Sequence, residues 1–195
     1  MKILLATNNK GKIKEIKEIL NEYEIVSLKD INLDIDVLED GETYYDNAYK
    51  KAKEIFKITN IPTIADDSGL CIKSLNNFPG VLTHRWMDGT DNDRNNGLIK
   101  KVKGKNRECS FICCLVFYDG KKTISVEESL KGKISDTPRG DNGFGFDPIF
   151  ELENGKTLAE LSNNEKNKIS ARKKSIESLK EKLGEYNENK NNKRI

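Results

Sequence analysis

Residues 109–118, CSFICCLVFY, form a mostly apolar run that limits the possible folds of this chain more than any other feature. An extended chain with this sequence is apolar on both faces, which predicts a central strand of a sheet. Asp119-Gly120 then signals a hairpin, and TISVEESL predicts the partner strand. No apolar run approaches the ~18–20 residues needed to cross a bilayer, so a membrane-spanning role is excluded.

A strand, a polar loop and a helix follow one another near the start of the chain. KILLAT predicts the strand, and the isoleucines from Ile13 to Ile19 recur at helical spacing. The loop between them, TNNKGK, is neither a Walker A loop nor a G-x-G-x-x-G motif. Free N–H groups and the helix dipole at such a junction nevertheless suit a phosphate group. An ordinary polar loop is the alternative.

Two adjacent carboxylates, Asp66 and Asp67, end the short apolar run PTIA. If the strand geometry persists, their side chains point to opposite faces, so one can bind a cation while the structure holds the other. Mg²⁺ takes one or two carboxylates plus substrate phosphates, and a carboxylate beside a metal-held water can act as general base. The alternative is an Asx turn after the strand.

Three further segments carry groups that could contribute to a site. Glu39 and Asp40 could supply a second metal ligand or lie in a solvated acidic loop. In GFGFDP, the glycines allow close approach to a ligand, and Phe144 or Phe146 could stack on a flat ring or belong to the core. The basic segment from Lys166 onward could bind an oxygen of a ligand, or form a solvated helix.

The remaining sequence predicts one folded domain over residues 1–183, followed by a polar and disordered tail over 184–195. A helix over residues 43–58 would place Asn47 and Lys51 on one face. We expect the four cysteines to be reduced and buried, because they form no C-x-x-C pair. Lysines interrupt residues 1–20, so a signal peptide is not expected and the predicted location is cytoplasmic.

The charges of the chain nearly balance. With 34 basic and 32 acidic residues, the formal net charge is +2. This argues against a dedicated nucleic-acid-binding protein, as does the lack of interleaved aromatic and basic residues in the basic segments.

The order of the motifs is more specific than any one of them. Along the chain come TNNKGK, E-x-G, D-N-A-x-x-K-A, IADDSGL, FPGV, GFGFDPIF and E-K-x-x-I-S-x-R. This order resembles the HAM1-like family of inosine triphosphate pyrophosphatases over residues 1 to about 183.

The resemblance implies a reaction and a fold. The chain would hydrolyse ITP, dITP and XTP, which arise by purine deamination, to the monophosphate and pyrophosphate with Mg²⁺. The implied fold is a HAM1/Maf-like α/β structure, with an elongated mixed β-sheet, flanking helices and two lobes that enclose a central active-site cleft. The implied assembly is a homodimer, with no membrane or nucleic-acid partner.

The resemblance also assigns roles to residues at matching positions. Asp67 would bind Mg²⁺ and accept the proton of the attacking water, Glu39 would be a second metal ligand, and Lys51 would reach the phosphates. The residues that would contact the substrate are Thr7, Asn8, Asn9, Lys10, Gly11, Lys12, Ser68, Phe144, Gly145, Phe146, Asp147, Lys166 and Arg172. Phe144 would stack on the base, and Arg172 would lie near its oxygen.

Two positions depart from the family pattern. The family has Ser-His-Arg where this chain has Ala171 before Arg172, which puts base selectivity in question more than hydrolysis. His84 replaces a small residue, and it would either substitute for the missing ring or pack elsewhere. Two alternatives therefore stay open: a related pyrophosphatase with shifted base specificity, and a non-catalytic nucleotide-binding protein.

Overall fold

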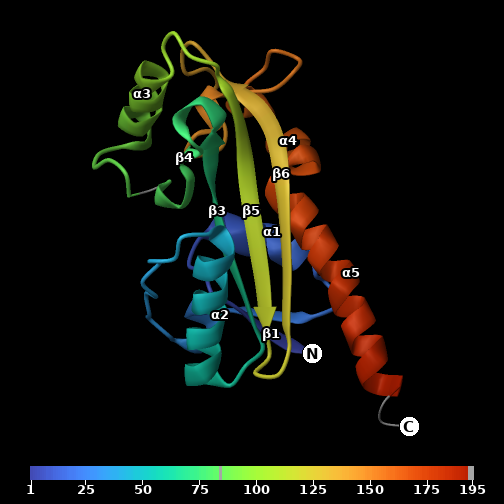
Figure 1. Cartoon of the computed structure of the whole chain (residues 1–195). Helices are drawn as coiled ribbons and strands as arrows, with labels where there is room; N and C mark the ends of the chain where they lie inside the picture. The colour runs from blue at the N-terminus through green and yellow to red at the C-terminus, as the bar shows by residue number, and fades with distance from the viewer. Residues whose placement is uncertain (84, 193–195) are drawn as a thin grey trace. The chain divides into compact units, whose positions relative to one another are not determined.

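The computed structural model describes residues 1–83 and 85–192, and the prediction for His84 lies outside them (Figure 1). The helices are α1 (Lys10–Ile19), α2 (Tyr44–Thr59), α3 (Asp91–Lys101), α4 (Asn163–Ile169) and α5 (Ala171–Asn192). The strands are β1 (Lys2–Leu5), β2 (Glu24–Ser27), β3 (Thr63–Ile72), β4 (Phe78–Pro79), β5 (Glu108–Tyr118), β6 (Thr123–Ile134) and β7 (Phe150–Glu151).

The strands form a mixed sheet. Hydrogen bonds join them in the order β2-β1-β3-β5-β6-β7, with β4 paired to β3. β1 is parallel to both β2 and β3, whereas β4 on β3 and β7 on β6 are antiparallel. A mixed sheet with flanking helices confirms the predicted α/β class. In the described part of the chain, no helix is long and apolar enough to cross a membrane.

The chain forms two compact units. The first unit comprises Met1–Asp67, Cys113–Glu128 and Arg172–Ile195, and the second comprises Ser68–Ile112 and Ser129–Ala171. β3, β5 and β6 each contribute residues to both units, so the boundaries fall inside strands. A change in composition cannot reveal such boundaries, because no linker marks them.

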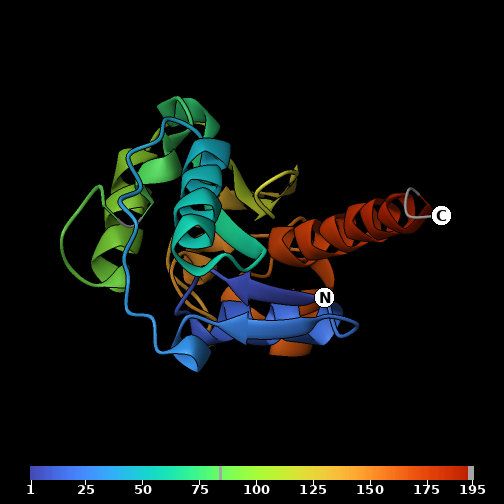
Figure 2. The ribbon, with the colours of Figure 1, turned by 90° about the horizontal axis from the view of Figure 1, so that it is seen from below.

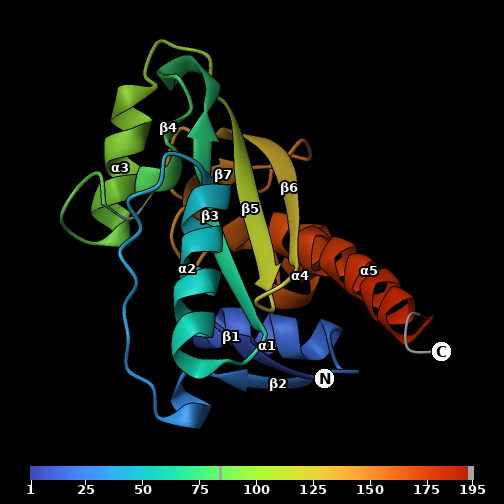
Figure 3. The ribbon, with the colours of Figure 1, turned by 60° about the horizontal axis from the view of Figure 1, so that its bottom comes forward.

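The first unit places a helix after its first strand, as the sequence predicted. The side chains of Ile3, Leu4 and Leu5 in β1 are fully buried. Figures 2 and 3 show β1 and β2 side by side, and their register pairs Leu4 with Val26. The apolar stripe of α2, including Ala48, is buried as well.

The C-terminal helix extends beyond the predicted end of the fold. α5 continues to Asn192, so the described part of the expected tail is helical. Two long-range contacts hold its last turns in place. The Tyr186 hydroxyl donates to Asp119 over 2.6 Å, and the Asn187 amide donates to the Tyr23 hydroxyl over 3.2 Å. The sequence suggested disorder because apolar residues are scarce here, but these polar partners are supplied by distant segments.

β3 runs without interruption through the motif ADDSG, where the sequence predicted that the strand over PTIA ends. All ten of its residues are buried except the half-buried Ser68. The strand continues because its carboxylates find polar partners on neighbouring elements, so no turn is needed to expose them to water.

The four cysteines are free thiols and buried, as predicted. Burial raises the pKa of the Cys113 thiol to about 12. The second unit has its own apolar core, which includes Leu98 of α3, Phe146 and Phe150.

Candidate functional site

Asp66 is a buried carboxylate surrounded by cations of the first unit. Its Oδ2 lies 2.6 Å from Nζ of Lys12 and 3.9 Å from Nε of Arg172. Burial alone would raise the pKa of Asp66, but the charges of Lys12, Arg172 and Lys51 outweigh burial and lower it to about 2. The sequence predicted that the protein itself would hold one carboxylate of the Asp66–Asp67 pair. Asp66 is that carboxylate.

Asp67 points to the other face of β3, because successive side chains of a strand alternate. Its Oδ2 accepts a hydrogen bond from Nδ2 of Asn47 on α2 over 2.9 Å, and both side chains are buried. The Oδ1 of Asn47 accepts the backbone N–H of Gly41 over 2.8 Å. A Cβ at Gly41 would lie 2.7 Å from that of Asp46, so the close approach of this loop requires glycine. The Asn47 amide thus ties Asp67 to the acidic loop.

Lys51 lies one helical turn after Asn47 and forms a partly buried ion pair with Glu39. Burial would lower the pKa of Lys51, but Asp66, Glu39 and Asp67 together raise it above its usual value. Lys51 therefore stays protonated, which suits a group that attracts phosphate rather than a base. Lys50 forms a parallel but more exposed pair with Asp40, at 2.6 Å.

The donor set of the first unit suits Mg²⁺. Glu39 and Asp67 offer hard carboxylate oxygens beside fixed cations. Over residues 1–83 and 85–192, no three His, Cys, Asp or Glu side chains gather to hold a metal ion. Two carboxylates, Glu39 and Asp67, are a number that Mg²⁺ commonly takes when water and substrate phosphates complete its shell.

The loop before α1 is capped by its own side chain, although its N–H groups were expected to be free. The Oδ1 of Asn9 accepts the N–H groups of Gly11 and Lys12 over 2.9 and 3.2 Å. The N–H of Asn9 in turn donates to the Thr7 hydroxyl over 3.2 Å. An N-cap asparagine satisfies helix donors that an anion could otherwise bind. The side chains of Asn8 and Lys10 lie exposed beside this cap.

The two phenylalanines of the Gly-rich loop differ in burial. Phe144 is 46% exposed, as expected for a residue that meets a ligand. Phe146 is only 4% exposed and packs in the apolar core of the second unit, so its place in a nucleoside pocket stays a prediction. The turn at Gly145, with φ +62°, separates the two rings and sends them into different environments.

Asp147 organises the part of the second unit around Phe144. Its buried Oδ2 accepts the N–H of Phe144 over 2.8 Å and lies 2.5 Å from Nζ of Lys166. The same ammonium lies 4.6 Å from the centroid of the Phe144 ring, within the range of a cation–π contact. The carboxylate would collide with a Cβ at Gly143, so glycine is required there. Phe144, Asp147 and Lys166 therefore act as one group.

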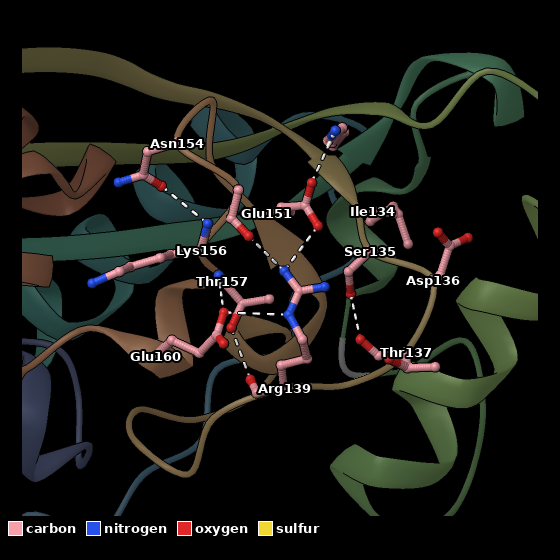
Figure 4. A network of polar contacts seen from close by, with 12 residues as sticks. Ile134, Ser135, Asp136, Thr137, Arg139, Glu151, Asn154, Lys156, Thr157 and Glu160 are labelled. Carbon is pink, nitrogen blue, oxygen red and sulfur yellow. Dashed lines mark hydrogen bonds and ion pairs between the residues drawn. The ribbon is translucent and has the colours of Figure 1, made fainter.

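Arg139 holds the segment that leads into the Gly-rich loop, residues 139–142 (Figure 4). Its guanidinium donates to Glu151 over 2.9 Å, to Glu160 over 3.3 Å and to the carbonyl oxygen of Gly155 over 2.7 Å. The Thr157 hydroxyl donates to the Arg139 carbonyl over 2.8 Å. No local pattern in the sequence predicts this network, because its partners come together only when the chain folds back after β7.

The predicted site residues thus form one group in each unit. The first unit brings together Lys12, Glu39, Lys51, Asp66, Asp67 and Arg172, and the second brings together Phe144, Gly145, Asp147 and Lys166. Arg172 was expected near a base, and its guanidinium lies near the carboxylates of Glu15 and Asp66: Nη1 is 3.4 Å from Oε2 of Glu15, and Nε is 3.9 Å from Oδ2 of Asp66. Ser68 is half-buried at the start of the second unit, and Ala171 is buried.

Asn47 is the main residue that the sequence analysis left without a role. The available signal was its spacing, because a residue four positions before Lys51 lies on the same face of a helix. The identity of its partners could not be inferred from that spacing.

Comparison with known proteins gives consistent matches along the whole fold. The family model described as "Ham1 family" matches residues 3–182. A dITP/XTP pyrophosphatase of Aquifex aeolicus is 42% identical over 192 residues, which cover 92% of this chain and 95% of that protein. One from Bacillus subtilis is 40% identical, with 90% and 93% covered. The solved Ham1 protein of Staphylococcus aureus has a TM-score of 0.89 at 34% identity, over 95% of this chain and all of that one (100%).

Proposed function

This chain belongs to the Ham1 family, and from that premise we propose that it hydrolyses dITP, ITP and XTP to the nucleoside monophosphate and pyrophosphate. The observation that carries the proposal is the geometry around Asp67. The buried Asp67 carboxylate accepts a hydrogen bond from Asn47 and lies near the charged Lys51, which pairs with Glu39. A base, a cation and a second carboxylate are groups that can promote cleavage of a phosphoanhydride.

The reaction is a proton-coupled attack of water on the α-phosphorus. The Asp67 carboxylate accepts a proton as the water oxygen bonds to phosphorus, and the α–β phosphoanhydride bond breaks to release pyrophosphate. Lys51 and Lys12 attract the charged phosphate oxygens, because both carry positive charge within the carboxylate cluster. The carboxylates of Glu39 and Asp67 would hold Mg²⁺, which when bound neutralises charge on the phosphates.

Base recognition would use the group around Phe144. Its exposed ring offers a surface on which a purine stacks, and Lys166 lies at that ring. The 6-oxygen of hypoxanthine and xanthine accepts a hydrogen bond, whereas adenine carries an amine there. A cationic donor such as Lys166 would therefore favour the deaminated bases.

Two wider proposals rest on the family resemblance and on chemistry. A homodimer is the expected assembly. A reducing, cytoplasmic location is expected, and four free cysteines accord with it.

The test is a panel of substrates. Pyrophosphate release from dITP, ITP, XTP, GTP, ATP and dTTP would be measured with Mg²⁺ and with chelator, for the wild type and for Asp67→Asn. We expect metal-dependent turnover that is highest for dITP, ITP and XTP, and a loss of about 10²–10⁴-fold in the variant. Turnover centred on another base would support the shifted-specificity alternative that Ala171 raises. Binding without turnover would support a nucleotide-binding protein instead.

A further inference from the structure

Two side chains of helix α3 form hydrogen bonds with Gly145, a residue of the Gly-rich loop GFGFDP (residues 143–148) in the second unit. The Oδ2 of Asp91 accepts the N–H of Gly145 over 3.0 Å. The Nδ2 of Asn95 donates to the carbonyl oxygen of the same Gly145, also over 3.0 Å. Both polar groups of one residue in the loop are therefore bound by side chains of one helix.

The sequence places these two side chains one turn apart. Asp91 and Asn95 are separated by four positions, so they lie on one face of α3. Thr90 caps the helix in a reciprocal capping box with Asp93, which fixes where the helix begins. Arg94 donates to Oδ1 of Asp91 over 2.8 Å and so holds the carboxylate whose other oxygen meets the loop.

The side chain of Asn95 is buried, and one end of its amide is left without a hydrogen bond in the described part of the chain. It is 2% exposed, and its Oδ1 has no hydrogen-bond partner among the described residues. Its bond to Gly145 is thus the polar interaction that its amide contributes. An amide buried with one end unsatisfied costs stability, which a hydrophobic residue would avoid.

We call the two hydrogen bonds that Asp91 and Asn95 form with Gly145 the clamp. The clamp lies next to Phe144, the ring proposed to stack on the base. Gly145 directly follows Phe144, whose own N–H is held by Asp147. Resting on the proposed function, we propose that Asp91 and Asn95 are positioning residues that hold Gly145 at both polar groups and thereby fix the Phe144 ring for the base. An exposed ring on an unclamped Gly-rich loop would lose conformational freedom on each binding event, whereas a pre-positioned ring does not.

The first test replaces the amide donor with an acceptor. Asn95→Asp puts a carboxylate against the Gly145 carbonyl. Asn96→Asp is the matched control on the same helix, where the amide donates to Oδ1 of Asn92 over 3.2 Å. Binding of dITP and of inorganic tripolyphosphate, a ligand without a base, is measured with Mg²⁺ in the Asp67→Asn background, so turnover is not required. We expect Asn95→Asp to weaken dITP binding about tenfold, with tripolyphosphate binding changed less than about twofold.

Fold integrity has an internal reporter. Trp86 is the single tryptophan of the chain, and a Cβ at Gly97 would lie 2.8 Å from its Cη2, so its indole packs on α3. Unchanged Trp86 emission in Asn95→Asp would show that α3 keeps its packing. If that variant does not fold, Asp91→Ala and Asp91→Asn give a second test, because only asparagine retains an acceptor for the Gly145 N–H.

The outcomes separate the two proposals. Weaker dITP binding in Asp91→Ala that Asp91→Asn largely restores supports the clamp. Unchanged dITP binding in folded Asn95→Asp and Asp91→Ala overturns the clamp, and so does an equal loss of tripolyphosphate binding. Wild-type protein that binds dITP but releases no pyrophosphate overturns the proposed hydrolysis and leaves the clamp supported or overturned by the binding data alone.

Discussion

Nδ2 of Asn47 lies 2.9 Å from Oδ2 of Asp67, and the other end of the same amide holds the backbone of Gly41. One buried side chain of α2 therefore connects the proposed general base to the loop that carries Glu39. Because Lys51 follows one turn later on the same helix, α2 aligns the proposed base, the lysine and the second carboxylate with one another.

Asn47→Ala should damage activity more than folding alone explains. The change leaves the Asp67 carboxylate without this donor and Gly41 without an acceptor, which should lower the free energy of unfolding by about 1–3 kcal/mol. We expect kcat to fall about tenfold or more, because a base that is not held in place transfers protons poorly. Urea unfolding and steady-state kinetics measure the two effects. The exposed Lys57→Ala on the same helix is the control, and a kcat equal to that of the wild type would refute the role of Asn47.

The two acidic residues before Gly41 should differ in their effect on metal dependence. Glu39→Gln removes a proposed Mg²⁺ ligand and the partner of Lys51, so the Mg²⁺ concentration at half-maximal rate should rise about tenfold or more. Asp40→Asn is the matched control, since Asp40 pairs with the more exposed Lys50. Titrations of initial rate against Mg²⁺ compare the two variants. A rise in the required Mg²⁺ concentration seen only for Asp40→Asn would mean that Asp40, and not Glu39, is the metal ligand.

Asp66 should make stability fall in acid. Lys12, Arg172 and Lys51 overcome the effect of burial and hold its pKa at about 2 in the folded protein, against about 3.9 in an unfolded chain. The stabilisation is therefore complete above about pH 4 and is lost as pH falls toward 2. The shift corresponds to about 2–3 kcal/mol.

Urea unfolding between pH 7 and pH 2 tests this expectation. The difference in unfolding free energy between wild type and Asp66→Asn should be largest near neutral pH and should shrink across that acid range. Asp136→Asn serves as the control, because its 91% exposed side chain forms a surface ion pair worth less than about 1 kcal/mol. A pH-independent difference for Asp66→Asn would contradict the argument.

Phe144 and Phe146 should respond in opposite ways to the same substitution. Phe146→Ala empties a core position and should cost about 3–5 kcal/mol of stability. Phe144→Ala removes a half-exposed ring and should change stability by less than about 0.5 kcal/mol. Its KM for dITP should nevertheless rise about tenfold, because stacking of a base on an aromatic ring is worth about 1–3 kcal/mol. Thermal melting and KM measurements on both variants decide, and a destabilised Phe144→Ala with normal KM would reverse the assignment.

Much of the local structure could be predicted because its causes are local. The helix over α2 and the two-sided burial of β5 depend on residues a few positions apart. The alternation of Asp66 and Asp67 also follows from strand geometry alone, once the strand is continuous. That continuity was missed, because the partners that make two buried carboxylates tolerable are remote in the chain.

The sequence by itself determined the α/β class, the main helices and strands, the order of the motifs and the chemical types available for a site. The tertiary structure alone decided which charges meet. Arg172 reaches Glu15 across 157 positions of sequence, and Asn47 reaches Asp67 across 20. It also decided that Phe146 is core and Phe144 is exposed. The physical reason is that periodicity reports local backbone geometry, whereas burial and the pairing of charges depend on long-range packing that no local pattern encodes.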